Sequence, residues 1–492
     1  MRGLYGVAFL FPFILGCQQS GDVLGECDED DVCETGDPVG VMYQARGVDI
    51  SEVAMYQTVK IPLMKNGEKQ STQVGIIAEK EALFRVFVTP HGDFSSREIE
   101  AVLRLDVGAE EPVEYRTTRT VSGGSNDSSL SSTFNLTVSP EHIAGTVEWS
   151  MELLETEEDF QGSEGESDAI YPQEGYSSFL AESMGGPLRI DILPVRYNAD
   201  SSGRLPDTSA ARIDEFRASL EAMYPASTVE IRVLDPLDWS QSVQAYGSGW
   251  SRLLEQLYYE RESRGTPYNT YLYGLFVPAN SLSSYCSSGC VLGLSTLANS
   301  PSDSWARISI GLGFSGGEAI ETLLHELGHA HGRSHAPCGT SDYDRSYPYN
   351  NGALGVWGYD RVAEKMKSPN SYADIMGYCD PAWISDYTYN ALYDRVQAVN
   401  GAADVYWPKE VSRSWQTVFV GETGALSWGP KVEPQRPPGD LVQEVRVRSR
   451  GTVQTVKAQF APYDHLAGGI LLIPDTADAD AEIEFNGFRL RR

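Results

Sequence analysis

The chain has 492 residues, with 38 Lys and Arg against 69 Asp and Glu, so its formal net charge is −31. Single domains usually have about 100–200 residues, and this length therefore predicts two to four domains. Apolar residues make up 41% and charged residues 22%, a composition that can bury cores and excludes a disordered polymer. The negative charge excludes nucleic acid as a partner and argues against electrostatic adhesion to an anionic membrane.

The chain opens with a processing signal. Arg2 supplies one positive charge, and residues 4–15 form an apolar run that is too short for a bilayer, which needs about 20 residues. The run ends in Ile14-Leu15-Gly16-Cys17, which resembles the lipobox of bacterial lipoproteins. The resemblance implies removal of residues 1–16 and a lipid on Cys17, while an ordinary secretory signal cut later is the alternative. We expect a protein of the bacterial cell envelope, anchored by lipid alone to the outer membrane or surface, or a secreted one.

The cysteine count agrees with an oxidising compartment. If Cys17 is lipidated, six cysteines remain, and an even number outside the cytoplasm favours three disulfides. Short spacings favour Cys27–Cys33 and Cys286–Cys290, which leaves Cys338–Cys379. Two alternatives remain open: Cys338 or Cys379 could pair with Cys286 or Cys290, or four cysteines could bind a metal.

The first half of the chain predicts a tether followed by a β-domain. Residues 17–40 are acidic and poor in apolar side chains, which is typical of a solvated spacer. Residues 41–155 contain seven short strand patterns separated by turn signals, and this predicts a β-sandwich of the immunoglobulin-like kind. Residues 156–186 are rich in Glu, Gly and Ser in their first half and predict a linker.

The second half predicts an α/β domain at 187–400 and a small β-domain at 401–492. Strand patterns at 188–193 and 229–233 flank a helical pattern at 209–224, which indicates a βαβ unit. A further helix is expected at 250–264, with strands at 271–277 and 306–312. The last 92 residues read as five strands with no evident chemistry. The predicted fold class is therefore a multidomain protein with an N-terminal β-sandwich, a central α/β domain and a C-terminal β-domain.

Four of the seven histidines fall within eleven residues, HELGHAHGRSH, at 325–335. Ser315 and Glu318 have the spacing of a capping box, so we expect a helix to begin there. At about 100° per residue, His325 and His329 lie roughly 40° apart on that helix and can reach one metal, whereas His331 faces away. Gly332 can end the helix in the left-handed conformation, and His335 can then return as a third ligand.

Three nitrogen ligands leave one position of a tetrahedral zinc open for water, which is the arrangement of a catalytic site. Glu326 is displaced from the ligand direction but can reach zinc-bound water, so it is predicted to act as the general base. The alternatives are a chance cluster or a structural zinc, and a structural site would need a fourth protein ligand for which Glu326 is badly placed.

The stretch matches H-E-x-x-H-x-x-G-x-x-H and thus resembles the signature of the metzincin zinc endopeptidases. The family also has a methionine turn beneath the zinc, and Met376 in Asp374-Ile375-Met376-Gly377-Tyr378 is the candidate. Tyr378 resembles the tyrosine that astacins and serralysins place near the metal, although it could merely pack. No subfamily is assigned, because Asp374 stands where those two families have Ser and Ala336 also differs from them.

The resemblance implies a metzincin-like zincin domain that hydrolyses peptide bonds of an extracellular protein or glycoprotein with one catalytic Zn²⁺. Metzincins hold the substrate along an edge strand, for which 306–312 is the candidate. The resemblance also places the third histidine beside the methionine turn, so a Cys338–Cys379 disulfide would join the two. The competing hypothesis is a surface adhesin or binding lipoprotein with a silent domain, and the intact Glu326 counts against it.

Two further features stay open. A pro-segment could lie within residues 18–186. Ca²⁺ has no support, because the spacing of the candidate acidic residues matches no calcium-binding loop. Those acidic residues are Asp342, Asp344, Asp475, Asp478 and Asp480.

Overall fold

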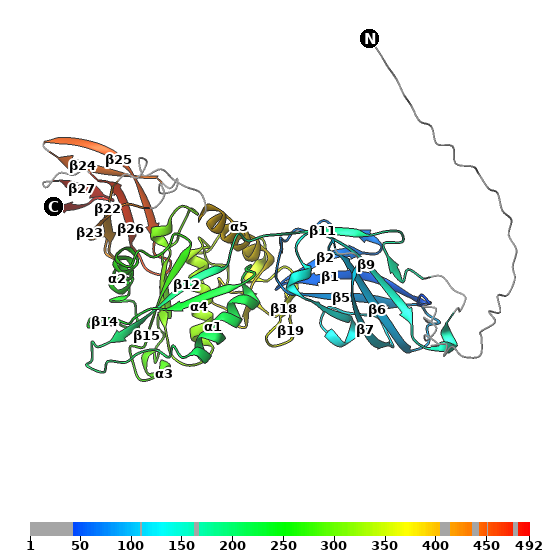
Figure 1. Cartoon of the computed structure of the whole chain (residues 1–492). Helices are drawn as coiled ribbons and strands as arrows, with labels where there is room; N and C mark the ends of the chain where they lie inside the picture. Colours follow the sequence, from blue (N-terminus) through cyan, green and yellow to red (C-terminus); the bar gives the residue numbers. More distant parts are fainter. Residues whose placement is uncertain are drawn as a thin grey trace, which may run out of the picture. The chain divides into compact units, whose positions relative to one another are not determined.

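The computed structural model describes residues 43–108, 111–161, 167–403, 414–434, 442–449, 451–475 and 481–492. It confirms a multidomain fold with N-terminal β-sheets, a central α/β domain and a C-terminal β-sheet (Figure 1). The predicted signal and tether lie outside the described residues, as do Cys17, Cys27 and Cys33. Within the described ranges, no helix is long and apolar enough to cross a membrane.

The N-terminal domain consists of two sheets with a common core. One sheet has the order β3-β2-β1-β5-β8, and the other has the order β4-β11-β9-β6-β7 with β10 added on β9. Apolar side chains from both sheets, such as Phe84 and Trp149, belong to one buried cluster. The strands are β1 (Val48–Tyr56), β2 (Lys60–Lys65), β3 (Glu68–Lys69), β4 (Ile76–Ile77), β5 (Ala82–Pro90), β6 (Arg97–Asp106), β7 (Val113–Val121), β8 (Phe134–Val138), β9 (Gly145–Glu155), β10 (Ile170–Tyr171) and β11 (Ser177–Glu182).

The stretch 156–186, expected to be a linker, carries two of these strands. Both β10 and β11 pair with β9, and Phe179 and Ala181 of β11 are buried. The alternation of buried and exposed residues in β11 spans only six residues and follows an acidic segment. Such a short pattern predicts a strand only when its partner strand is known.

The central domain is built on a mostly parallel sheet of order β13-β12-β15-β17-β16, with β14 on the end of β12. Its members are β12 (Leu188–Tyr197), β13 (Val229–Val233), β14 (Leu237–Trp239), β15 (Thr270–Phe276), β16 (Gly293–Ser295) and β17 (Ile308–Leu312). The stretch 306–312, expected to be the edge strand, is mostly β17, and it lies inside the sheet because antiparallel β16 covers it. All five residues of β17 are buried, as is usual for an internal strand.

Helices cover both faces of this sheet (Figure 1). Side chains of α1 and α4 belong to the cluster that continues into the N-terminal domain, whereas those of α2 belong to the cluster shared with the C-terminal sheet. Alternate residues of β15 divide between the clusters, with Tyr271 and Tyr273 in the first and Leu272 and Phe276 in the second. The α-helices are α1 (Ala210–Met223), α2 (Trp250–Ser263), α3 (Leu282–Tyr285), α4 (Glu318–Ala330) and α5 (Asp386–Ala403).

Two small strand pairs follow α4, the first antiparallel and the second parallel, and the C-terminal sheet follows α5. The pairs are β18 (Gly358–Asp360) with β19 (Lys365–Lys367) and β20 (Ala373–Asp374) with β21 (Ala382–Trp383). The sheet has the order β23-β22-β26-β25-β24-β27-β28. Its strands are β22 (Trp415–Val420), β23 (Leu426–Val432), β24 (Val442–Ser449), β25 (Thr452–Pro462), β26 (Gly469–Pro474), β27 (Glu482–Phe485) and β28 (Phe488–Arg491).

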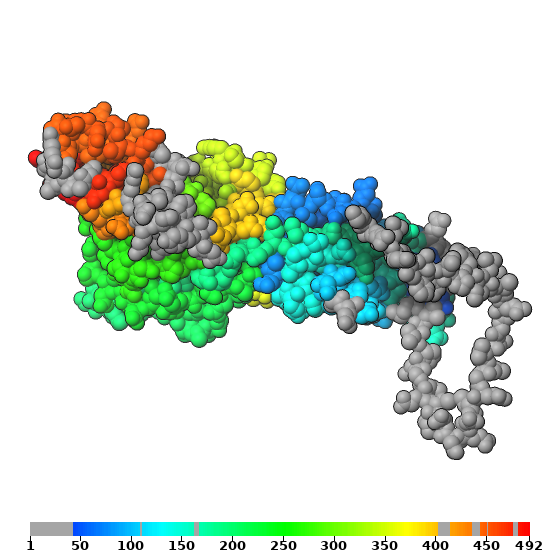
Figure 2. Space-filling model, turned by 45° about the horizontal axis from the view of Figure 1, so that its top comes forward, coloured from blue at the N-terminus to red at the C-terminus, as the bar shows by residue number. Residues whose placement is uncertain are grey.

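The C-terminal sheet packs on α2 of the central domain. Figure 2 shows its orange and red residues resting on the green central residues. The Tyr258 ring meets Phe419 edge to face at 5.8 Å, and the Tyr258 hydroxyl lies 2.8 Å from Thr417 Oγ1. This buried contact fixes the sheet beside the central domain.

Lys80 of the N-terminal domain binds the end of α1. Its side chain is nearly inaccessible, and Nζ donates to the carbonyls of Glu221, Tyr224 and Ala226 at 2.7, 3.1 and 3.0 Å. The last carbonyls of a helix have no partner within the helix, and a cation there is favourable. The N-terminal domain therefore caps a helix of the central domain.

We expect Lys80→Met to destabilise the protein by about 2–3 kcal/mol, because it leaves buried carbonyls without a donor. The exposed Lys65→Met on β2 is the matched control and should change stability little. Urea unfolding measures both variants. Equal midpoints for the two would contradict the capping role.

Candidate metal centre

Helix α4 carries two of the expected ligands one turn apart. The helix begins at Glu318 after Gly317, and no side chain caps it, so the predicted Ser315 capping box is wrong. The Gly317 carbonyl accepts from the N–H groups of Ile320 and Glu321 at 2.8 and 3.0 Å. The two glycines after Ser315 let the chain turn directly into the helix.

Gly332 ends this helical segment and turns the chain back toward the site. Its φ is +87°, and an added Cβ would collide with the Ala298 carbonyl, so only glycine fits. The turn returns the His335 ring to 4.6 Å from the His329 ring and 5.5 Å from the His325 ring. His331 points elsewhere, as expected, and stacks on Tyr271 at 4.1 Å.

Three buried imidazoles direct free lone pairs at one another. Each Nδ1 contacts a carbonyl oxygen, which can only accept, so each Nδ1 carries the proton and each Nε2 is bare. The Nε2 atoms of His325 and His329 lie 3.0 Å apart. Burial lowers the pKa of His325 to about 3 and that of His329 well below its usual range. The carbonyls belong to Ile375 at 2.7 Å, Arg333 at 2.6 Å and Asp342 at 3.2 Å.

A cation placed between these nitrogen lone pairs would remove the repulsion among them. The candidate ligand atoms of five side chains all lie within 4.8 Å of one another: His325, His329, His335, Asp464 and His465. Neutral imidazoles and a carboxylate are a ligand set that suits zinc. The residues present therefore fit a metal ion.

Glu326 lies beside the ligands with its carboxylate pressed against β16. An added Cβ on Gly293 would collide with this carboxylate, so the glycine makes room for it. Oε1 accepts from His465 Nε2 at 3.2 Å, and Oε2 has no hydrogen-bond partner among the described residues. Burial, followed by the Asp464 carboxylate, raises the pKa of Glu326 to about 8.

Met376 forms the floor beneath α4. It is buried, and an added Cβ on Gly328 would collide with its sulfur atom. Asp374 holds the turn, because Oδ1 accepts from the Met376 N–H at 2.8 Å and Oδ2 accepts from the Ser385 N–H at 2.9 Å. The aspartate thus uses both of its carboxylate oxygens, one for each amide.

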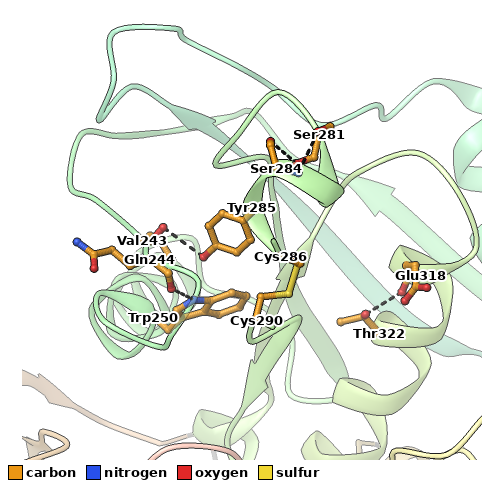
Figure 3. The surroundings of a disulfide bond; sticks show 10 residues. All are labelled: Val243, Gln244, Trp250, Ser281, Ser284, Tyr285, Cys286, Cys290, Glu318 and Thr322. Carbon is orange, nitrogen blue, oxygen red and sulfur yellow. Dashed lines mark hydrogen bonds between the residues drawn. A yellow bond between two sulfur atoms is a disulfide. The ribbon is translucent and has the colours of Figure 1, made fainter. Parts of the chain in front are cut away.

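Tyr378 borders an open pocket of about 400 Å³. Its hydroxyl lies 2.8 Å from His335 Nε2 and 2.5 Å from His465 Nδ1. Figure 3 shows the Cys286–Cys290 disulfide facing Glu318 and Thr322 of α4, and Cys290 and these two residues line the pocket. Edge strand β16 adds Gly293 to the same lining.

The Cys338–Cys379 disulfide ties the His335 loop to the methionine turn. The Ala336 N–H donates to the Met376 carbonyl at 2.9 Å, and the Tyr378 N–H donates to the Cys338 carbonyl at 2.8 Å. Both disulfides of the described residues are pairs expected from the sequence. Disulfides persist in oxidising compartments, so they indicate an extracytoplasmic protein.

Asp464 and His465 were not predicted. They lie between β25 and β26 in the C-terminal domain, for which the sequence predicted no chemistry, and the structure corrects that expectation. One signal was available: His465 is one of only three histidines outside 325–335, and it follows an acid between two strands. Nothing local, however, indicates which site such a pair joins.

Two of the acidic residues considered for calcium form ion pairs with cationic side chains, and two lie outside the described residues. The Asp344 carboxylate pairs with Arg333 at 3.3 Å, and Lys431 lies 2.7 Å from the Asp475 carboxylate. Asp478 and Asp480 lie outside the described residues. Calcium binding gains no support from the structure.

Comparison with known proteins identifies the region that carries the three clustered histidines and Glu326. Residues 302–404 match the sequence model of the family described as Peptidase M66, so the chain carries a metalloendopeptidase domain. No curated protein matches the chain. A crystal structure assigned as a beta-galactosidase from Bacteroides fragilis shares 9% identity, with 91% of this chain and 72% of that chain covered and a TM-score of 0.14. A likeness this weak carries no argument.

We expect Cys338→Ser with Cys379→Ser to weaken metal binding, probed with Zn²⁺, by at least about tenfold, because the disulfide holds the loop of one candidate ligand, His335. The matched control, Cys286→Ser with Cys290→Ser, removes a disulfide from a loop that carries none of the three histidines, and it should leave the affinity for Zn²⁺ unchanged. Competition with a chromophoric chelator measures both. Equal affinities for all three proteins would show that the disulfide does not support the metal.

Proposed function

We propose that this protein is a zinc-dependent endopeptidase of the metzincin type that cleaves extracellular proteins or glycoproteins. The observation that carries the proposal is the convergence of three bare Nε2 atoms beside the Glu326 carboxylate at the base of an open pocket. The Peptidase M66 match over the same residues supports it.

The chain's own residues would divide the work as follows. Zinc, when bound by His325, His329 and His335, would supply a Lewis acid that acidifies water and polarises a carbonyl. Glu326 takes the proton from the attacking water through its unpartnered Oε2 and returns it to the leaving amine. Tyr378, on the pocket wall and 47% exposed, donates a hydrogen bond to the developing oxyanion.

The pocket lining suits an extended chain that runs beside β16. Gly293 of this edge strand and Glu326 stand together at the pocket, so a scissile bond held along β16 would lie next to the base. The substrate strand is therefore proposed at β16 rather than at 306–312.

Glu326→Gln should keep zinc and lose activity by about 10²–10⁴-fold, because it removes the base but none of the three histidines. Glu68→Gln, an exposed change on β3, is the control and should cleave as the unaltered protein does. A peptide library read by mass spectrometry, with and without a chelator, measures cleavage. If Glu326→Gln cleaves at the control rate, Glu326 is not the base.

Attachment to the membrane is proposed from the sequence alone, through a lipid on Cys17. Cys17→Ser should release the protein from the membrane fraction, because the lipid would be its anchor. Fractionation with immunoblotting measures this. The lipid proposal fails if the altered protein sediments with membranes as before.

A further inference from the structure

The segment that joins β25 to β26 continues the edge of the central sheet. The Asp464 N–H donates to the Ser295 carbonyl at 3.2 Å, and the Leu297 N–H donates to the Pro462 carbonyl at 2.9 Å. Thr296 and Tyr463 form an antiparallel bridge between these bonds. The C-terminal domain thus pairs with residues 295–297 next to the metal centre, and this pairing sets the position of Asp464.

The Asp464 carboxylate is fully buried, and one of its oxygens has no hydrogen bond. Oδ1 accepts from the Ser295 N–H at 2.7 Å. Oδ2 lies 3.3 Å from His329 Nε2 and 2.9 Å from His465 Nε2, yet neither contact has hydrogen-bond geometry. A buried carboxylate oxygen in this state is costly unless a cation balances it.

We propose that Asp464 is a fourth protein ligand of the metal, supplied by the C-terminal domain. The proposal rests on the metal centre of the proposed function. Its Oδ2 is the unpartnered acceptor that stands among the three histidines, whose Nε2 lone pairs are free for the same ion. Three imidazoles and one carboxylate complete a tetrahedral zinc site.

The neighbouring His465 fits this arrangement by its contacts. The Tyr378 hydroxyl lies 2.8 Å from His335 Nε2 and 2.5 Å from His465 Nδ1, so it keeps a partner in His465 when His335 Nε2 is taken by a metal. His465 Nε2 lies 3.2 Å from Glu326 Oε1 and 2.9 Å from Asp464 Oδ2, so this ring stands between the two acidic side chains. Among the described residues, Glu326 Oε2 and Asp464 Oδ2 are left without a hydrogen-bond partner, and Asp464 Oδ2 lies 3.3 Å from the nearest ligand nitrogen, His329 Nε2.

Two consecutive residues of the C-terminal domain therefore contact the metal position and the proposed base, Glu326. Asp464 takes the position that a catalytic zinc leaves for water, and His465 binds the proposed base. The folded site is coordinatively complete, so hydrolysis requires that water or substrate displace the Asp464 carboxylate. The C-terminal domain thereby limits access to the metal.

The test compares Asp464→Asn with the unaltered full-length protein. Asparagine retains the oxygen that accepts from Ser295, and its amide is a poor zinc ligand. Glu444→Gln, an exposed change on β24, removes one charge from the same sheet and serves as the control. The readouts are zinc affinity by chelator competition, the visible spectrum of the Co²⁺-substituted protein, and titration of that spectrum with azide.

For Asp464→Asn we expect zinc affinity at least about tenfold weaker, an altered Co²⁺ spectrum, and a response to azide at a concentration at least about tenfold lower. Glu444→Gln should match the unaltered protein. Zinc should also raise the Tm of the unaltered protein more than that of Asp464→Asn, since tighter binding stabilises more. The Tm measurement replaces chelator competition if the protein binds zinc too tightly for the chelator to compete.

Identical zinc affinity, spectrum and azide response in Asp464→Asn and the unaltered protein would overturn the fourth-ligand proposal and leave the three-histidine site standing. If the unaltered protein binds no metal, the proposed function fails and this inference fails with it. If zinc binds and peptides are cleaved, yet Asp464→Asn behaves as Glu444→Gln does, only this inference is lost.

Discussion

Three imidazole lone pairs and two acidic side chains converge in a buried space, and a bound cation relieves the repulsion among them. Each imidazole is held by a carbonyl on its other nitrogen, so none can turn away to relieve the repulsion. The rest of the central domain keeps this cluster in place. Helix α4 sets two rings one turn apart, Gly332 returns the third, and the Asp374 carboxylate holds the turn that lies beneath them.

The site draws on three parts of the chain that are distant in sequence. The His325 helix, the Met376 turn and the Asp464 segment meet only because two hydrophobic clusters fix the layers around β15. Disulfide Cys338–Cys379 adds a covalent link between the third-ligand loop and the turn. The geometry of the metal centre is therefore a property of the assembled domains rather than of one motif.

Features that depend on neighbours in sequence could be predicted, and features that depend on tertiary contacts could not. Helical periodicity indicates α4, and residue type indicates the left-handed Gly332, because both arise within a few residues. Strand β16 has three residues, which is too short for a pattern, and Asp464 lies more than 120 residues beyond the last histidine of the motif. The prediction of a Ser315 cap was wrong, because Gly316 and Gly317 let the backbone turn into the helix without a side-chain hydrogen bond.

The division of labour between domains explains how one ligand could leave without loss of the site. The carbonyls that orient His325, His329 and His335 all belong to the central domain, as does the turn beneath them. Asp464 is held instead by Ser295, at the edge of the central sheet, and by its place in the C-terminal domain. The sheet of that domain packs on α2 through the contact between Tyr258 and Phe419. Displacement of the Asp464 carboxylate therefore breaks none of the hydrogen bonds that orient the three imidazoles. A metal that loses its fourth ligand in this way keeps the other three in position, and the vacated place lies beside Glu326.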